Sequence, residues 1–149
     1  MSLIQVGATA PPVAGASLQE TTAVVFYKVT CPVCQMAAPV IDLLERSYPG
    51  RVVGVGQDPV EALGEFARDF EMRAVASRPD LPPYEMSNAY GIESVPTVVL
   101  VDGGRVVDVV PAWDRDGYNR VSAELAASIG AEPVVISKPG DGLPPYRPG

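Results

Sequence analysis

Residues 24–34 read Val-Val-Phe-Tyr-Lys-Val-Thr-Cys-Pro-Val-Cys, and this stretch decides the fold of the 149-residue chain. The apolar, β-branched and aromatic run over residues 23–29 is typical of a strand that is covered on both faces. Cys31-Pro32 then begins a helix, because proline suits the first helical position, where its missing N–H is not needed. Cys31 and Cys34 therefore lie where a buried strand passes into a helix.

Strands and helices continue to alternate along the rest of the chain. We expect strands at 51–56, 73–77, 97–101 and 105–110, and helices at 31–48, 59–70 (with Asp58 as its N-cap), 84–90 and 114–129. The residues Asp102-Gly103-Gly104 predict a hairpin turn between the last two strands. This order predicts an α/β fold with a mixed central β-sheet flanked by helices on both faces.

The chain length fits one compact domain, which we place at residues 1–130. Its first 20 residues are rich in turn-forming residues and are expected to form an irregular N-terminal extension. Residues 131–149, called the C-terminal tail below, are rich in proline and glycine and are expected to be extended or mobile.

The chain carries 18 acidic and 11 basic residues, a formal net charge of -7. Such a charge argues against nucleic acid and anionic membrane surfaces as partners. No apolar run reaches the roughly 18 residues that a membrane span needs, so no membrane span is expected. The first fifteen residues lack the basic and apolar regions of a signal peptide, which favours a cytoplasmic location.

The chain has two cysteines and no histidine. The lack of histidine excludes Ser-His-Asp and Cys-His catalysis, and Gln35 stands where c-type haem attachment needs histidine. Two thiolates offer a zinc ion only half of its usual four ligands, so a zinc site would need added carboxylates or a second subunit. The two cysteines could also be small buried packing residues.

Their position favours thiol–disulfide exchange without a cofactor. The free N–H groups and the dipole at the start of a helix favour a thiolate on Cys31, and the thiolate is the attacking nucleophile. Cys34 lies one turn further along the same helix, where we expect it to be buried. It can therefore resolve a mixed disulfide formed on Cys31, and the pair supplies both the attack and the release.

Residues 24–34, 52–58 (Val-Val-Gly-Val-Gly-Gln-Asp) and 89–107, which contain Val-Pro-Thr, resemble the thioredoxin superfamily. The resemblance covers about residues 5–128 and is to the branch of TlpA-like reductases and peroxiredoxin-related redoxins. It implies a thioredoxin-like fold in which Pro96 follows a cis peptide bond, faces the two cysteines and covers the first of them.

The resemblance also implies which residues act. Cys31 and Cys34 would be catalytic, and Val95, Pro96, Thr30 and Pro32 would bind substrate, with the backbone of Val95 free to pair with an extended substrate chain. The partners would be protein disulfides or dithiols and an electron donor that the sequence does not identify.

The chain departs from the pattern of the family that it resembles at three positions, two of which hold that family's usual proton acceptors. Val25 stands where thioredoxins have a buried aspartate, Ala37 stands where many TlpA-like reductases have a glutamate, and Thr30 replaces a tryptophan. Two alternative functions stay open. One is a thiol peroxidase using Cys31, although the threonine expected three residues before the cysteine is here Lys28. The other is a redox-responsive binding module whose C-terminal tail docks a partner.

Overall fold

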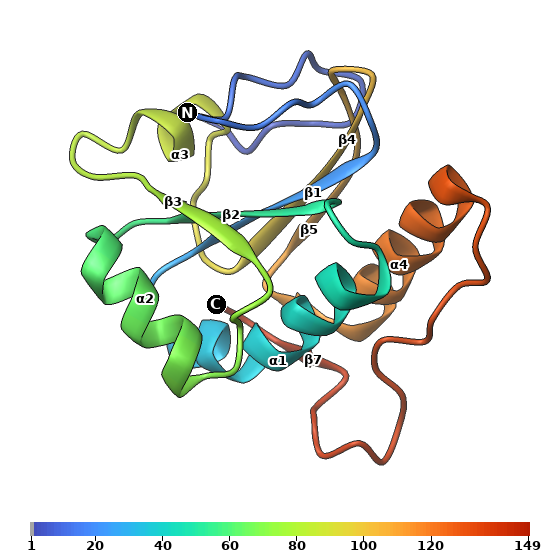
Figure 1. The fold of residues 1–149 in the computed structure, drawn as a ribbon. Coiled ribbons are helices and arrows are strands. Elements are labelled where there is room, and N and C mark those ends of the chain that lie inside the picture. Colours follow the sequence, from blue (N-terminus) through green and yellow to red (C-terminus); the bar gives the residue numbers. More distant parts are fainter. Residues whose placement is uncertain (1) are drawn as a thin grey trace.

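A computed structural model describes residues 2–149, and in it a five-stranded mixed sheet separates two layers (Figure 1). The strands are β1 (Thr22–Tyr27), β2 (Val52–Gly56), β3 (Ala76–Pro79), β4 (Thr97–Asp102) and β5 (Arg105–Pro111). They lie in the order β3-β2-β1-β4-β5, with β1, β2 and β3 parallel and β4 antiparallel to both of its neighbours. The predicted mixed sheet is therefore confirmed.

Helices cover both faces of the sheet, as predicted, but unequally. They are α1 (Pro32–Ser47), α2 (Val60–Asp69), α3 (Glu85–Ala89) and α4 (Arg115–Ile129). Side chains of α1, α2 and α4 share one core with Ala23, Val25 and Tyr27 of β1. Val24 and Phe26 point to the opposite face, where α3 and the N-terminal extension cover the sheet (Figure 1). This alternation explains the continuous apolar run of β1.

Two predicted details are wrong. The third strand was expected at 73–77, but β3 begins at Ala76, where its parallel ladder with β2 starts at Val53. Asp58 is not the N-cap of α2, since Pro59 takes that position without a side-chain cap. The Asp58 carboxylate instead accepts a hydrogen bond from the Val29 N–H at 2.9 Å. In both places a contact with a distant strand or loop overrides the local pattern.

The predicted hairpin turn joins β4 to β5. Gly103 and Gly104 have φ of 57° and 76°, a left-handed backbone that glycine adopts without steric cost. Their N–H groups donate to Gln19 and Leu18 of the N-terminal extension at 2.8 Å each, so the turn also holds that extension to the sheet. No helix within residues 2–149 combines the length and the apolar character that crossing a membrane requires.

The C-terminal tail packs against the helices. It leaves α4, turns back and ends beside the N-terminal end of α1 (Figure 1). Ile136 and Ser137 are buried, and Leu143 packs against the core that α1 and α4 share. Near its end, β7 (Tyr146–Arg147) pairs antiparallel with β6 (Trp113–Asp114). The domain boundary at residue 130 stays a prediction.

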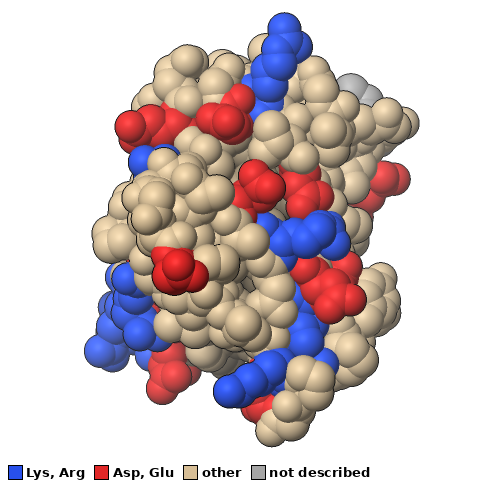
Figure 2. Space-filling view, turned by 90° about the vertical axis from the view of Figure 1, so that its right-hand side faces the viewer, with Lys and Arg blue, Asp and Glu red and all other residues tan. Residues whose placement is uncertain are grey.

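The surface charge is mixed on the face that Figure 2 shows. Acidic and basic side chains are interspersed there, and broad neutral areas separate them. This face therefore presents no continuous basic surface of the kind that binds a phosphate backbone.

Candidate active site

The first turn of α1 places the two cysteines together. Cys31 is the N-cap of α1 with an extended backbone (φ −82°, ψ 114°), and Pro32 is the first helical residue. The Cys34 N–H donates to the Cys31 sulfur at 3.1 Å. Both cysteines are free thiols; Cys31 is half-buried, whereas only 1% of Cys34 is exposed. The outer sulfur therefore sits at a helix N-terminus that can stabilise its thiolate.

The inner thiol is held in its neutral form. Burial raises the pKa of Cys34 well above its usual value, and the neighbouring Cys31 sulfur raises it further. Cys34 is thus protonated at neutral pH and must lose a proton before it can attack.

The loop before β4 faces the first cysteine. The Cys31 thiol donates to the carbonyl oxygen of Val95 across 3.4 Å. The Val95–Pro96 peptide bond is cis, and the Thr97 hydroxyl donates to the Ser94 carbonyl at 2.8 Å and closes the turn. Of the predicted site residues, Cys31, Cys34 and Val95 therefore come together directly. The contact to Cys31 runs through the backbone of Val95, and Pro96 is buried behind it.

The remaining predicted site residues lie at the rim. Thr30 and Pro32 are exposed on either side of Cys31. Lys28, the nearest charged residue in sequence, is also exposed, while its backbone carbonyl accepts the Cys31 N–H at 3.1 Å. Exposed residues around a half-buried sulfur leave this side of the site open to an incoming disulfide.

Two polar side chains that the sequence analysis did not assign to the site hold the junction of β1 and α1. The Asp58 carboxylate accepts from the Val29 N–H at 2.9 Å, and the Gln35 amide donates to the Val29 carbonyl at 2.9 Å. Satisfying both polar groups of Val29 fixes the loop that carries Cys31. The sequence held no signal for these contacts, because each partner is recruited by the tertiary fold.

Tyr118 of α4 lies in the core that also contains Cys34. Its hydroxyl is fully buried and has no hydrogen-bond partner among residues 2–149. Burial raises the pKa of Tyr118, and negative charge on Cys34 or Cys31 would raise it further. Nothing in the sequence linked Tyr118 to the cysteines.

The tail also reaches the site. A β-carbon added to Gly149 would overlap the Val95 carbonyl oxygen and lie 2.8 Å from the Val95 carbonyl carbon. Gly149 therefore lies directly against the carbonyl that Cys31 contacts. The family resemblance implies a free Val95 backbone, whereas in the structure Gly149 lies beside it.

Metal ligands are few around the cysteines. Within residues 2–149, no three histidine, cysteine, aspartate or glutamate side chains gather where they could hold a metal ion. A zinc ion bound by Cys31 and Cys34 would therefore need further ligands that these side chains do not supply.

Comparison with known proteins gives two curated relatives, both thioredoxins. Thioredoxin 1 of a Nostoc species is 29% identical over 85 residues, and thioredoxin of a Synechocystis species is 31% identical over 85 residues. Each alignment covers 57% of this chain and 60% of the relative's length. No family model matches the chain.

Solved structures match over more of the chain. DsbF of MTB, solved in mixed oxidised and reduced forms, is 28% identical with a TM-score of 0.64, covering 72% of this chain and 82% of that one. A secreted Mycobacterium tuberculosis disulfide oxidoreductase homologous to E. coli DsbE has 22% identity and a TM-score of 0.63, covering 83% and 95%. The thioredoxin domain of a Bacteroides vulgatus thiol-disulfide oxidoreductase has 19% identity and a TM-score of 0.67, covering 82% and 99%. The last two matches support the fold alone.

Proposed function

This chain is a member of the thioredoxin superfamily, and from that premise we propose that it is a thiol–disulfide oxidoreductase that exchanges disulfides with protein substrates through Cys31 and Cys34. The observation that carries the proposal is the geometry at the start of α1. The half-buried Cys31 sulfur accepts the Cys34 N–H at 3.1 Å and faces the Val95 carbonyl at 3.4 Å. The geometry thus supports Cys31 as the nucleophile and Cys34 as the resolving thiol, with the Val95 backbone beside them as the contact for substrate.

In the first step the Cys31 thiolate attacks one sulfur of a substrate disulfide. A Cys31–substrate disulfide forms, and the other substrate sulfur leaves as a thiolate. Cys34 then loses its proton to solvent and attacks the Cys31 sulfur. The Cys31–Cys34 disulfide forms and the second substrate sulfur leaves, so two electrons have passed from the protein to the substrate. An external dithiol reverses these steps and restores the reduced pair.

The helix start and the Val95 loop have separate roles in this scheme. The N–H of Cys34 stabilises negative charge on the Cys31 sulfur, both before attack and when that sulfur becomes a leaving group. The Val95 backbone, with Pro96 behind it and Thr30 and Pro32 at the rim, would orient the substrate chain beside the sulfur. Asp58 and Gln35 keep the loop that carries Cys31 in place.

The test is a redox titration. The reduced protein is equilibrated with glutathione and dithiothreitol couples of known potential, and the fraction of Cys31–Cys34 disulfide is measured. We expect a reversible two-electron midpoint between about −270 and −120 mV, the range of such proteins. Absence of a reversible intramolecular disulfide would overturn the proposal. Peroxide reduction that survives Cys34→Ser would point to the peroxidase alternative instead.

The rate at which the mixed disulfide resolves should increase with pH. Because burial raises the pKa of Cys34, its thiolate fraction at neutral pH is small and grows about tenfold per pH unit below that pKa. We therefore expect the release of the second substrate thiolate to accelerate about tenfold per unit between pH 6 and 8. Single-turnover stopped-flow measurements with a small disulfide give this rate. A pH-independent release in that range contradicts the assignment of Cys34.

The compartment of the protein is not fixed by the proposed reaction. The cytoplasmic location stays a prediction from the sequence, and one of the similar solved structures is described as secreted. The midpoint potential indicates the direction of electron flow. A value near −270 mV suits a reductant, and a value near −120 mV suits an oxidant.

A further inference from the structure

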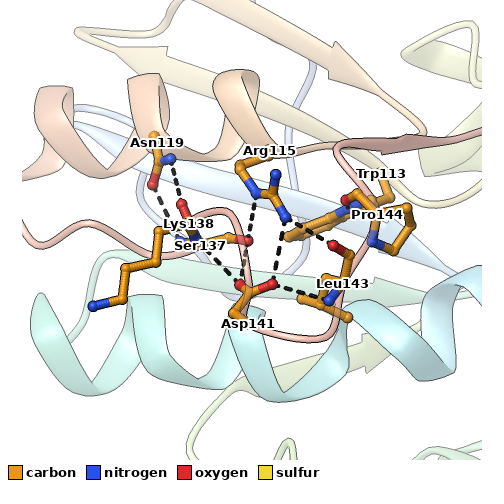
Figure 3. A network of polar contacts seen from close by, with 8 residues as sticks. All are labelled: Trp113, Arg115, Asn119, Ser137, Lys138, Asp141, Leu143 and Pro144. Atoms are coloured by element: carbon orange, nitrogen blue, oxygen red, sulfur yellow. Dashed lines mark hydrogen bonds and ion pairs between the residues drawn. The ribbon is translucent and has the colours of Figure 1, made fainter.

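The bend of the C-terminal tail is fixed by a buried arginine. Arg115 is 9% exposed and donates to the Ser137 hydroxyl at 3.1 Å and to the Leu143 carbonyl at 2.8 Å (Figure 3). It also lies 3.4 Å from the Asp141 carboxylate, which in turn accepts from the Ser137 hydroxyl at 2.6 Å and the Leu143 N–H at 2.9 Å. Each of the four residues thus contacts at least two of the others.

This network is charged at neutral pH. The hydrogen bond from Ser137, followed by that from the Leu143 N–H, lowers the pKa of Asp141 to about 2. Charge-assisted hydrogen bonds on a buried guanidinium are short and directional, so they fix the path of the chain through residues 137–143. Residues 137–143 of the tail are therefore held in a defined conformation against α4.

From this bend the chain is directed to the cysteines. The Trp113 indole N–H donates to the Pro144 carbonyl at 2.7 Å, and β7 (Tyr146–Arg147) pairs with β6. Beyond β7, Gly149 lies against the Val95 carbonyl that also accepts the Cys31 thiol. Residues 146–149 are called the tail end below, and its last residue therefore lies at the backbone beside which a substrate chain would run.

We propose that the tail end is a specificity element that favours small disulfides over disulfides within extended protein chains. The inference rests on the proposed function and specifies which substrates reach Cys31 without displacing the tail end. A substrate chain and the tail end cannot both lie against the backbone of Val95, so a protein substrate must displace the tail end. A small disulfide needs only the exposed residues around Cys31. The tail end is itself exposed and held by a two-residue ladder, so a protein substrate can displace it at a moderate loss of affinity.

Gly149→Val in the full chain tests the proposal. A valine side chain cannot fit against the Val95 carbonyl, so residue 149 must move away from Val95 while the Arg115 network remains. We expect kcat/KM for insulin reduction to rise about tenfold, because the substrate chain no longer competes with residue 149 for the backbone of Val95. The value for oxidised glutathione should change less than twofold. The matched control is Gly64→Ala on α2, whose added carbon meets only the Arg68 guanidinium at 3.7 Å.

A second measurement does not depend on enzymatic activity. In a Cys34→Ser background only Cys31 reacts with alkylating reagents, and its rate is compared for iodoacetamide and for a maleimide carried on a long polymer. We expect Gly149→Val to raise the ratio of the polymer rate to the iodoacetamide rate about tenfold. Asp141→Ala, which removes the carboxylate that fixes the bend, should change the ratio in the same direction.

The two measurements separate the possible failures. An unchanged ratio in both tail variants, together with unchanged insulin selectivity, overturns the role of the tail end. If the ratio rises but the Cys31–Cys34 pair shows no reversible midpoint, the tail end covers Cys31 and the proposed oxidoreductase function is what fails.

Discussion

Replacing Cys31 with serine is expected to slow disulfide exchange by about 1,000-fold or more, because the attacking thiolate is lost and no mixed disulfide can form at that position. Cys31 is the only one of the two cysteines with a sulfur open to substrate, since Cys34 is 1% exposed. Insulin reduction with dithiothreitol as the electron donor measures the effect. The fold should be unchanged, because serine keeps the size and the capping position.

Cys34→Ser is the matched control for that experiment. It keeps the attacking Cys31 and removes the resolving thiol, so it should accumulate a covalent adduct between Cys31 and the substrate, which mass spectrometry detects. Adducts found on Cys34 in the Cys31→Ser variant would contradict the assignment. So would Cys31→Ser retaining more than about a tenth of the activity, a loss too small for a missing nucleophile.

The core of the site could be predicted because its geometry is local. Pro32 marks the start of α1, and the spacing of Cys31 and Cys34 places the second cysteine one turn inside the helix. The position of Val95 opposite them came only from the resemblance to a family. Asp58 shows where local reasoning ends: its sequence position suggests a helix cap, yet its carboxylate binds the Val29 N–H on another loop.

The same limit explains why the docking of the tail was missed. Proline and glycine predict an extended segment, but they carry no information about what that segment contacts. The contact depends on Arg115, which lies in the first turn of α4 and which no sequence pattern linked to the tail. In the fold it is buried between α4 and the tail, where Ser137, Asp141 and Leu143 satisfy it. Only the tertiary structure brings these residues together.

Trp113→Ala is expected to cause the largest loss of stability, about 3–5 kcal/mol in the free energy of unfolding. Trp113 is fully buried, and its ring packs on Tyr118 with the ring centres 4.7 Å apart. Its removal leaves a cavity beneath the tail and deprives the Pro144 carbonyl of a donor that now lies 2.7 Å away. Urea unfolding followed by circular dichroism measures the change.

Two further variants show which part of Trp113 matters. Trp113→Phe keeps most of the packing and loses the indole N–H, so it should cost about 1–3 kcal/mol, the usual range for an unpaired buried polar group. Val107→Ala removes an apolar side chain that is 41% exposed on β5 and should change stability by no more than about 0.5 kcal/mol. A loss below about 1 kcal/mol for Trp113→Ala would mean that the tail and α4 do not share a packed core at this residue.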